Sequence, residues 1–196
     1  ITEIWSQTTT DVWAIGNFAG GGVPFKLIGT TWQIQSAQTW EGLSGMWGTA
    51  NDSLWAVGNF GLVLKWDGLS WSEERQGPIS SLLGVWGTGK EDIWTVGDGG
   101  EILNWNGQTW VAKPGDTRQL LRGIWGSSAS QIWAVGNQGT ILRWNGNAWK
   151  SQNTVATANL NSVWGSDFNN VWAAGDDGAI LKWNGSSWNA QASGTA

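Results

Sequence analysis

The sequence of 196 residues contains no histidine, no cysteine and no tyrosine. Their absence excludes Ser-His-Asp and Cys-His nucleophiles, zinc bound by cysteine or histidine, and haem with a histidine or cysteine axial ligand. Disulfide bonds are excluded as well, and a chain without cysteine gives no indication of its redox compartment. We therefore expect neither a cofactor nor a metal centre.

Charge and long hydrophobic runs are also scarce. Only 13% of the residues are charged, and the net charge is −5. Binding to a nucleic-acid backbone requires a basic face, so we expect no nucleic-acid partner. No apolar run approaches the roughly 18 residues that a membrane-spanning helix needs, so we expect no direct membrane insertion.

Tryptophan and glycine are abundant, with 20 and 30 residues. The tryptophans recur in a repeated unit of about 40 residues, which is a length typical of β-propeller blades. Each unit begins with a Trp preceded by a short apolar stretch, and a second Trp follows eight residues later. A third segment reads Ile-Leu-x-Trp-Asn-Gly-x-x-Trp, as in residues 102–110, 141–149 and 180–188. The opening tryptophans are Trp5, Trp47, Trp86, Trp125 and Trp164.

Each unit contains four short apolar stretches separated by Gly, Asn, Asp, Ser and Thr, a pattern typical of strands and turns. In the last unit these stretches are residues 160–166, 171–175, 179–184 and 187–190. The Asn-Gly pairs between the third and fourth stretches predict two-residue type I′ turns. The sequence therefore predicts an all-β fold, a five-bladed β-propeller with four antiparallel strands and about 39 residues in each blade.

The predicted propeller is a single domain over residues 1–196, with blades at approximately 1–39, 40–78, 79–117, 118–156 and 157–196. Successive units are joined by connections of equal length, and joining Trp188 to Trp5 across the termini would need a similar one. We therefore expect a ring closed by side-chain packing, with no blade shared between the two ends. A solenoid is the competing architecture, but it would leave sheet edges exposed.

The repeat resembles the tectonin repeat of tectonin-type and tachylectin-type lectins. The resemblance is carried by the Val-Trp-Gly-Ser, Val-Trp-Ala-x-Gly-Asp and Ile-Leu-Lys-Trp-Asn-Gly-x-x-Trp segments of the last unit. The turn that begins at Asp67-Gly68 is also similar to Asp-box propellers and to photosystem assembly factors. Relatives of the tectonin type bind sugars, so the resemblance implies glycan binding.

Three groups of residues are candidates for ligand binding. An Asn or Asp opens the turn between the second and third strands of every blade, where it can form the turn itself or bind sugar hydroxyls. Trp40 lies in a connection and has no counterpart in other units, so it can stack on a sugar, anchor a partner or pack locally. Basic residues precede the third-strand Trp, where they can stack on it or contact an anionic ligand. The first group is Asn17, Asn59, Asp98, Asn137 and Asp176, and the third includes Lys65, Arg143 and Lys182.

The acidic pairs of the sequence do not predict an enzyme. Glu73-Glu74, Glu91-Asp92 and Asp176-Asp177 are each adjacent in polar turns, whereas a glycosidase needs two carboxyl groups across a cleft. Two hypotheses remain. The first is a non-catalytic, extracellular, periplasmic or cell-surface lectin-like propeller with several weak, quasi-equivalent sites. The alternative is a protein-interaction scaffold within a larger extracellular or membrane-associated assembly. Under either hypothesis we expect a monomeric ring or a subunit of a larger assembly.

Overall fold

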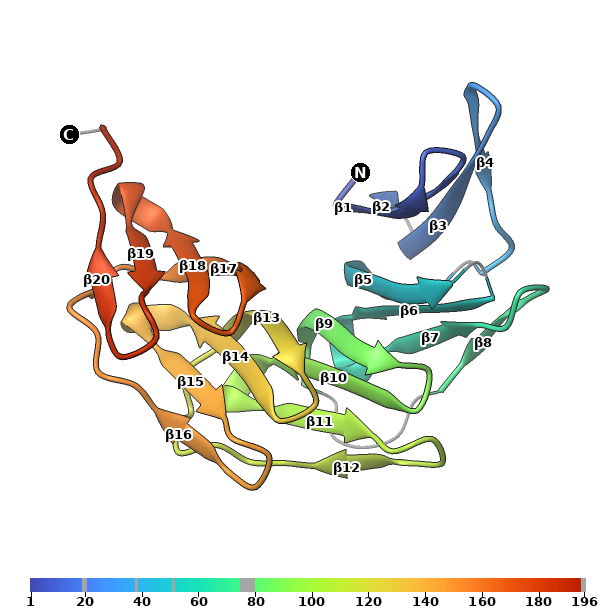
Figure 1. Cartoon of the computed structure of the whole chain (residues 1–196). Helices are drawn as coiled ribbons and strands as arrows, with labels where there is room; N and C mark the ends of the chain where they lie inside the picture. The colour runs from blue at the N-terminus through green and yellow to red at the C-terminus, as the bar shows by residue number, and fades with distance from the viewer. Residues whose placement is uncertain (19–20, 38, 51, 75–79, 195–196) are drawn as a thin grey trace.

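The chain is an all-β, five-bladed propeller (Figure 1). The computed structural model describes residues 1–18, 21–37, 39–50, 52–74 and 80–194. These residues form five sheets, each of four antiparallel strands that follow one another in sequence order. The repeated unit of four short apolar stretches separated by turn residues predicts this architecture, and the structure confirms it.

The strands occupy equivalent places in every blade. The first strands are β1 (Glu3–Thr8), β5 (Leu43–Ala50), β9 (Leu82–Gly89), β13 (Leu121–Ser128) and β17 (Leu160–Asp167). The second strands are β2 (Asp11–Phe18), β6 (Ser53–Gly58), β10 (Asp92–Gly97), β14 (Gln131–Gly136) and β18 (Asn170–Gly175). The third strands are β3 (Gly21–Ile28), β7 (Val63–Trp66), β11 (Ile102–Trp105), β15 (Ile141–Trp144) and β19 (Ile180–Trp183). The fourth strands are β4 (Thr31–Ile34), β8 (Trp71–Glu73), β12 (Trp110–Ala112), β16 (Trp149–Ser151) and β20 (Trp188–Ala190).

The tryptophans form the core between blades. In the third blade Trp86 lies opposite Trp94, and Trp105 lies opposite Trp110. Directly opposed residues of an antiparallel pair point to the same face of the sheet, so each pair presents two indole rings to a neighbouring blade. The second-strand tryptophans of the first four blades are at most 3% exposed. Large flat rings thus fill the space between adjacent sheets.

The turn between the third and fourth strands differs from the prediction. Trp105 pairs with Trp110, which leaves four residues in the loop instead of two. Only Gly107 of the Asn-Gly pair has a positive φ, at 92°, so the turn is not of type I′. The side chain of Asn106 accepts hydrogen bonds from the backbone N–H groups of Gln108 and Thr109 and thereby closes the loop. The asparagine is required for its side-chain oxygen, and only the glycine for its backbone conformation.

The predicted closure of the ring is wrong. Neighbouring blades pack through their first strands in the series β1, β5, β9, β13 and β17. Within the described residues, no comparable packing joins β17 or β18 of the fifth blade to the first blade. Figure 1 shows the consequence, an arc of five blades in which the first (blue) and the fifth (red) stand apart. The termini therefore do not meet where an ordinary connection between blades would run.

Candidate functional site

The turns between second and third strands lie at one end of the propeller together with the connections between blades. We call this end the connection face. Four of the turns are single 3-10 turns: η1 (Asn59–Gly61), η2 (Asp98–Gly100), η3 (Asn137–Gly139) and η4 (Asp176–Gly178). The backbone N–H of the Asn or Asp that opens each turn donates to a carbonyl of the connection leading into the same blade, at 2.9 Å in every case. Turn and connection thus form one surface.

Three of the five Asn and Asp side chains at these turns hold the fold together. Asn17 donates to the carbonyl of Leu43 at 3.0 Å and accepts from its N–H at 2.8 Å, which clamps the first blade to the second. Asn137 accepts a 2.8 Å hydrogen bond from Nε of Arg122. The carboxylate of Asp176 accepts bonds from two asparagine side chains, described next. Their bonding supports the turn-forming interpretation for these residues.

The Asp176 carboxylate accepts two side-chain hydrogen bonds on the connection face. Nδ2 of Asn161 donates to it at 2.6 Å, and Nδ2 of Asn159 donates at 2.9 Å. These two hydrogen bonds stabilise the charged form and hold the pKa of Asp176 below its usual range. Asp98 is exposed and accepts a hydrogen bond from the N–H of Gly99. Asn59 is half-buried beside the connection between the first and second blades. Binding of a ligand by this group stays a prediction.

Trp40 is 89% exposed on the connection face, between the first and second blades. Phe18 and Phe60 are 62% and 58% exposed and belong to the same region. Phe18 pairs with Gly21, and a Cβ added at Gly21 would lie 2.9 Å from the Cα of Trp40. On the other side, the N–H of Asn59, which precedes Phe60, donates to the carbonyl of Gly42. We call Phe18, Trp40 and Phe60 the apolar patch.

The two phenylalanines were missed in the sequence, although Phe60 carries a recognisable signal. In the structure Phe60 has a φ of 53°, a left-handed conformation that is strained for a bulky aromatic residue. Gly99, Gln138 and Asp177 occupy the equivalent position in the third, fourth and fifth blades. A Phe at a turn position that otherwise holds Gly or a polar residue is unusual, and comparing the repeats would have singled it out.

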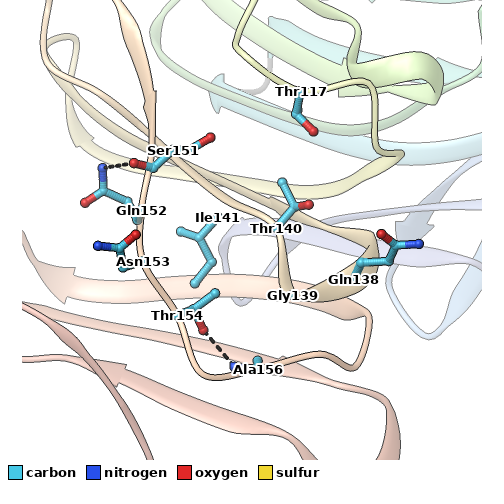
Figure 2. A pocket seen from close by; sticks show the side chains of 10 residues that line it. All are labelled: Thr117, Gln138, Gly139, Thr140, Ile141, Ser151, Gln152, Asn153, Thr154 and Ala156. Atoms are coloured by element: carbon cyan, nitrogen blue, oxygen red, sulfur yellow. Dashed lines mark hydrogen bonds between the residues drawn. The ribbon is translucent and has the colours of Figure 1, made fainter.

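Two hollows of the same kind also lie on the connection face. The larger, about 530 Å³, lies in the fourth blade between η3 and the chain that follows β16. Figure 2 shows hydroxyl and amide groups of Gln138, Thr140, Ser151 and Thr154 around Ile141. The smaller, about 270 Å³, occupies the equivalent place in the third blade. None of the described residues that line the two hollows is aromatic, so neither offers a ring on which a sugar could stack.

The basic residues lie at the opposite end of the blades, next to the turns between third and fourth strands. Nζ of Lys65 is 5.1 Å from the ring centroid of Trp55, and that of Lys182 is 4.8 Å from the centroid of Trp172. Cζ of Arg143 lies 4.4 Å above the ring of Phe168, and burial lowers the pKa of this guanidinium. The structure therefore separates these cations from Trp40 and the Asn and Asp turns. Their contacts match the stacking interpretation.

The described residues contain no group of three or more Asp and Glu that could hold a metal ion. None of the described segments forms a helix long and apolar enough to cross a lipid bilayer.

No family model and no curated protein matches the chain. Solved structures do match. "YCF48 bound to D1 peptide" has a TM-score of 0.70 and 19% identity over 92% of this chain and 63% of its own. YCF48 from Cyanidioschyzon merolae has a TM-score of 0.70 and 16% identity over 94% of this chain and 67% of its own. The WD40 β-propeller domain of Doa1 has a TM-score of 0.76 and 10% identity over 98% of this chain and 67% of its own.

These similarities identify the class of protein as a β-propeller. They do not single out the tectonin or tachylectin lectins, so the resemblance seen in the sequence is supported only at the level of the propeller repeat. The chain spans slightly less than two thirds of the first of these structures.

Proposed function

We propose that this propeller is a non-catalytic recognition module that binds a polypeptide partner on its connection face. The apolar patch carries the proposal. Protein interfaces obtain most of their binding energy from a few aromatic anchors surrounded by polar groups that exclude water. Trp40 is the most exposed aromatic side chain among the described residues, and two phenylalanines lie in the same region.

The surroundings of the patch support this proposal. Asn17 and the backbone of residues 41–43 are fixed by hydrogen bonds between the first two blades, so the anchors stand on a rigid base. A rigid surface loses little conformational entropy when a partner binds. A propeller of the same fold is described as bound to a peptide, which supports the idea that the architecture can accommodate one.

The test uses two residues with almost equal exposure at opposite ends of the molecule. Trp40 is 89% exposed on the connection face, and Leu69 is 90% exposed in the turn between β7 and β8. Peptides selected from a random-sequence display library against the full chain would be titrated by calorimetry against the Trp40→Ala and Leu69→Ala variants. We expect Trp40→Ala to weaken binding at least about tenfold, which corresponds to roughly 1.4 kcal/mol, and Leu69→Ala to leave it unchanged.

Equal binding by the parent and Trp40→Ala would argue against the apolar patch as the anchor. Glycan binding is the second candidate function, because hollows repeat at equivalent places in the third and fourth blades and the one in the fourth blade is lined by hydroxyl and amide groups. An oligosaccharide array probed with the chain distinguishes the two. Sugar binding that is lost in Gln138→Ala and retained in Trp40→Ala would favour the glycan hypothesis.

A further inference from the structure

The four junctions between blades share one arrangement of tryptophans. The second-strand Trp of each blade packs against the third- and fourth-strand tryptophans of the next blade in the chain. Trp13, for example, lies 5.1 Å from Trp66 and 5.9 Å from Trp71, measured between ring centroids. At the last junction Trp133 lies 4.9 Å from Trp183 and 5.2 Å from Trp188. Each blade thus inserts one ring between two rings of its successor.

A second contact repeats beside the first. The first-strand Trp of each blade lies over a glycine that directly follows the first-strand Trp of the next blade. A Cβ at Gly126 would come within 2.6 Å of the Trp86 ring, and one at Gly165 within 2.7 Å of the Trp125 ring. Side chains do not approach each other this closely, so the receiving position must be glycine for the ring to fit.

The fifth blade presents the inserting half of this junction without a successor. Its first-strand Trp164 is 61% exposed, whereas the equivalent rings in the first four blades are half-buried. Trp172 contacts Lys182 of its own blade, but within the described residues no Trp pair lies against it. In Figure 1 this face, formed by β17 and β18, looks out of the open end of the arc.

The first blade lacks the receiving half that the fifth would need. Ser6 stands where the other four blades have the receiving glycine, and Leu27 stands where they have the third-strand Trp. By analogy with Gly126 and Gly165, where an added Cβ would collide with the ring of the preceding blade, we expect the Cβ of Ser6 to hinder a tryptophan ring in the same place. The fifth blade therefore does not fit the first blade in the manner of the four existing junctions, whether in the same chain or in a second copy.

We propose that the open face of the fifth blade, defined by Trp164 and Trp172, is the docking surface for a further blade of the same repeat in the same polypeptide. That blade would carry glycine after its first-strand Trp, and tryptophan in both its third and fourth strands. The proposal rests on continuity with the four existing junctions, because the face offers the same inserting rings in the same direction. The solved propellers that the chain resembles are longer than this chain, which covers 63% and 67% of the first two.

The test extends the full chain at its C-terminus with a second copy of residues 157–196, which contains the required glycine and Trp pair. Hydrogen–deuterium exchange of the β17 and β18 amides reports on the face. We expect this exchange to slow at least about tenfold in the extended chain. We also expect Trp172→Ala to change the unfolding equilibrium constant at least about tenfold more in the extended chain than in the original, because its ring would then be enclosed by a successor.

The matched control carries the same extension with features of the first blade, namely the changes corresponding to Gly165→Ser and Trp183→Leu in the added copy only. We expect this extension to leave exchange of β17 and β18 unchanged. Equal protection by both extensions, or protection by neither, would overturn the proposal. A second copy of the chain is the other possible occupant of this face, and sedimentation of the 196-residue chain tests it. A concentration-dependent dimer that Trp164→Ala abolishes would identify a second copy instead of a further blade.

Discussion

Trp133→Ala is the perturbation that most directly probes the packing between blades. Its ring is fully buried and lies against Trp183 and Trp188 of the fifth blade. A buried tryptophan removes on the order of 200 Å² from water, which at about 25 cal/mol per Å² gives roughly 5 kcal/mol. This area-based value is an upper bound, because the unfolded chain already buries part of its surface.

Two further effects act in opposite directions. Each aromatic contact adds about 0.5–1.5 kcal/mol beyond the buried area. The indole Nε1 of Trp133 is buried and has no hydrogen-bond partner among the described residues, so its removal recovers about 1–3 kcal/mol. The two effects nearly cancel. Substitutions of buried Trp or Phe by Ala cost about 3–5 kcal/mol in general, and we expect a loss near 4 kcal/mol.

Trp172→Ala is the matched control, since Trp172 holds the same place in the repeat as Trp133. Its ring is half-buried and is not enclosed by a following blade, so we expect a loss of only about 1–2 kcal/mol. Equilibrium unfolding in urea, followed by far-UV circular dichroism, measures both variants. Equal losses would refute the argument, because they would show that contact with the next blade contributes nothing to the stabilising effect of the ring.

Two further substitutions test the connection face. Gly139→Ala places a Cβ 2.0 Å from the carbonyl oxygen of Ala156 at a residue whose φ is +67°. We therefore expect urea unfolding to show a loss of at least about 2 kcal/mol of stability. The control is Gly89→Ala, whose added Cβ meets open space, and we expect it to change stability by less than about 1 kcal/mol. Asn161→Ala removes the strongest hydrogen bond to the Asp176 carboxylate, so the pKa of Asp176 should rise toward its ordinary value in a carboxyl NMR titration, and an unchanged pKa would contradict the assignment. Because the folded pKa of Asp176 is lowered, its contribution to stability is present above the pKa of the unfolded chain and disappears as the pH falls through the folded value; this loss on acidification should be smaller in Asn161→Ala.

The blades could be predicted from the sequence because their determinants are local and repeated five times. Short apolar stretches, turn residues and regularly spaced tryptophans specify strands whose rings meet across each sheet. Turn geometry was harder to predict, because Asn106-Gly107 supports either a two-residue turn or a four-residue loop closed by the asparagine side chain. The Trp105–Trp110 pairing decides between them, and it depends on how the rings pack against the neighbouring blade.

The candidate site was predicted only in part. Trp40 stood out because it breaks the repeat, and the structure places it almost fully in solvent. Lys65 and the other cations were predicted as a separate candidate group, and the structure places them at the opposite end of the blades from Trp40. Phe18 and Phe60 were not among the predicted site residues. The structure leaves both side chains exposed, Phe18 at the end of β2 and Phe60 within the turn η1.

The open ring shows why a residue's role in a repeat protein depends on its neighbours as much as on its identity. Trp133 and Trp172 are the same residue at the same position of the same motif, and only the first is enclosed by the next blade. The stability of stacked repeats is approximately a sum of contributions from each unit and each junction between units. A tryptophan that forms the core at an internal junction therefore becomes an exposed apolar surface at a terminal one. Ser6 and Leu27 replace, in the first blade, the glycine and the third-strand tryptophan that receive a ring at the other four junctions.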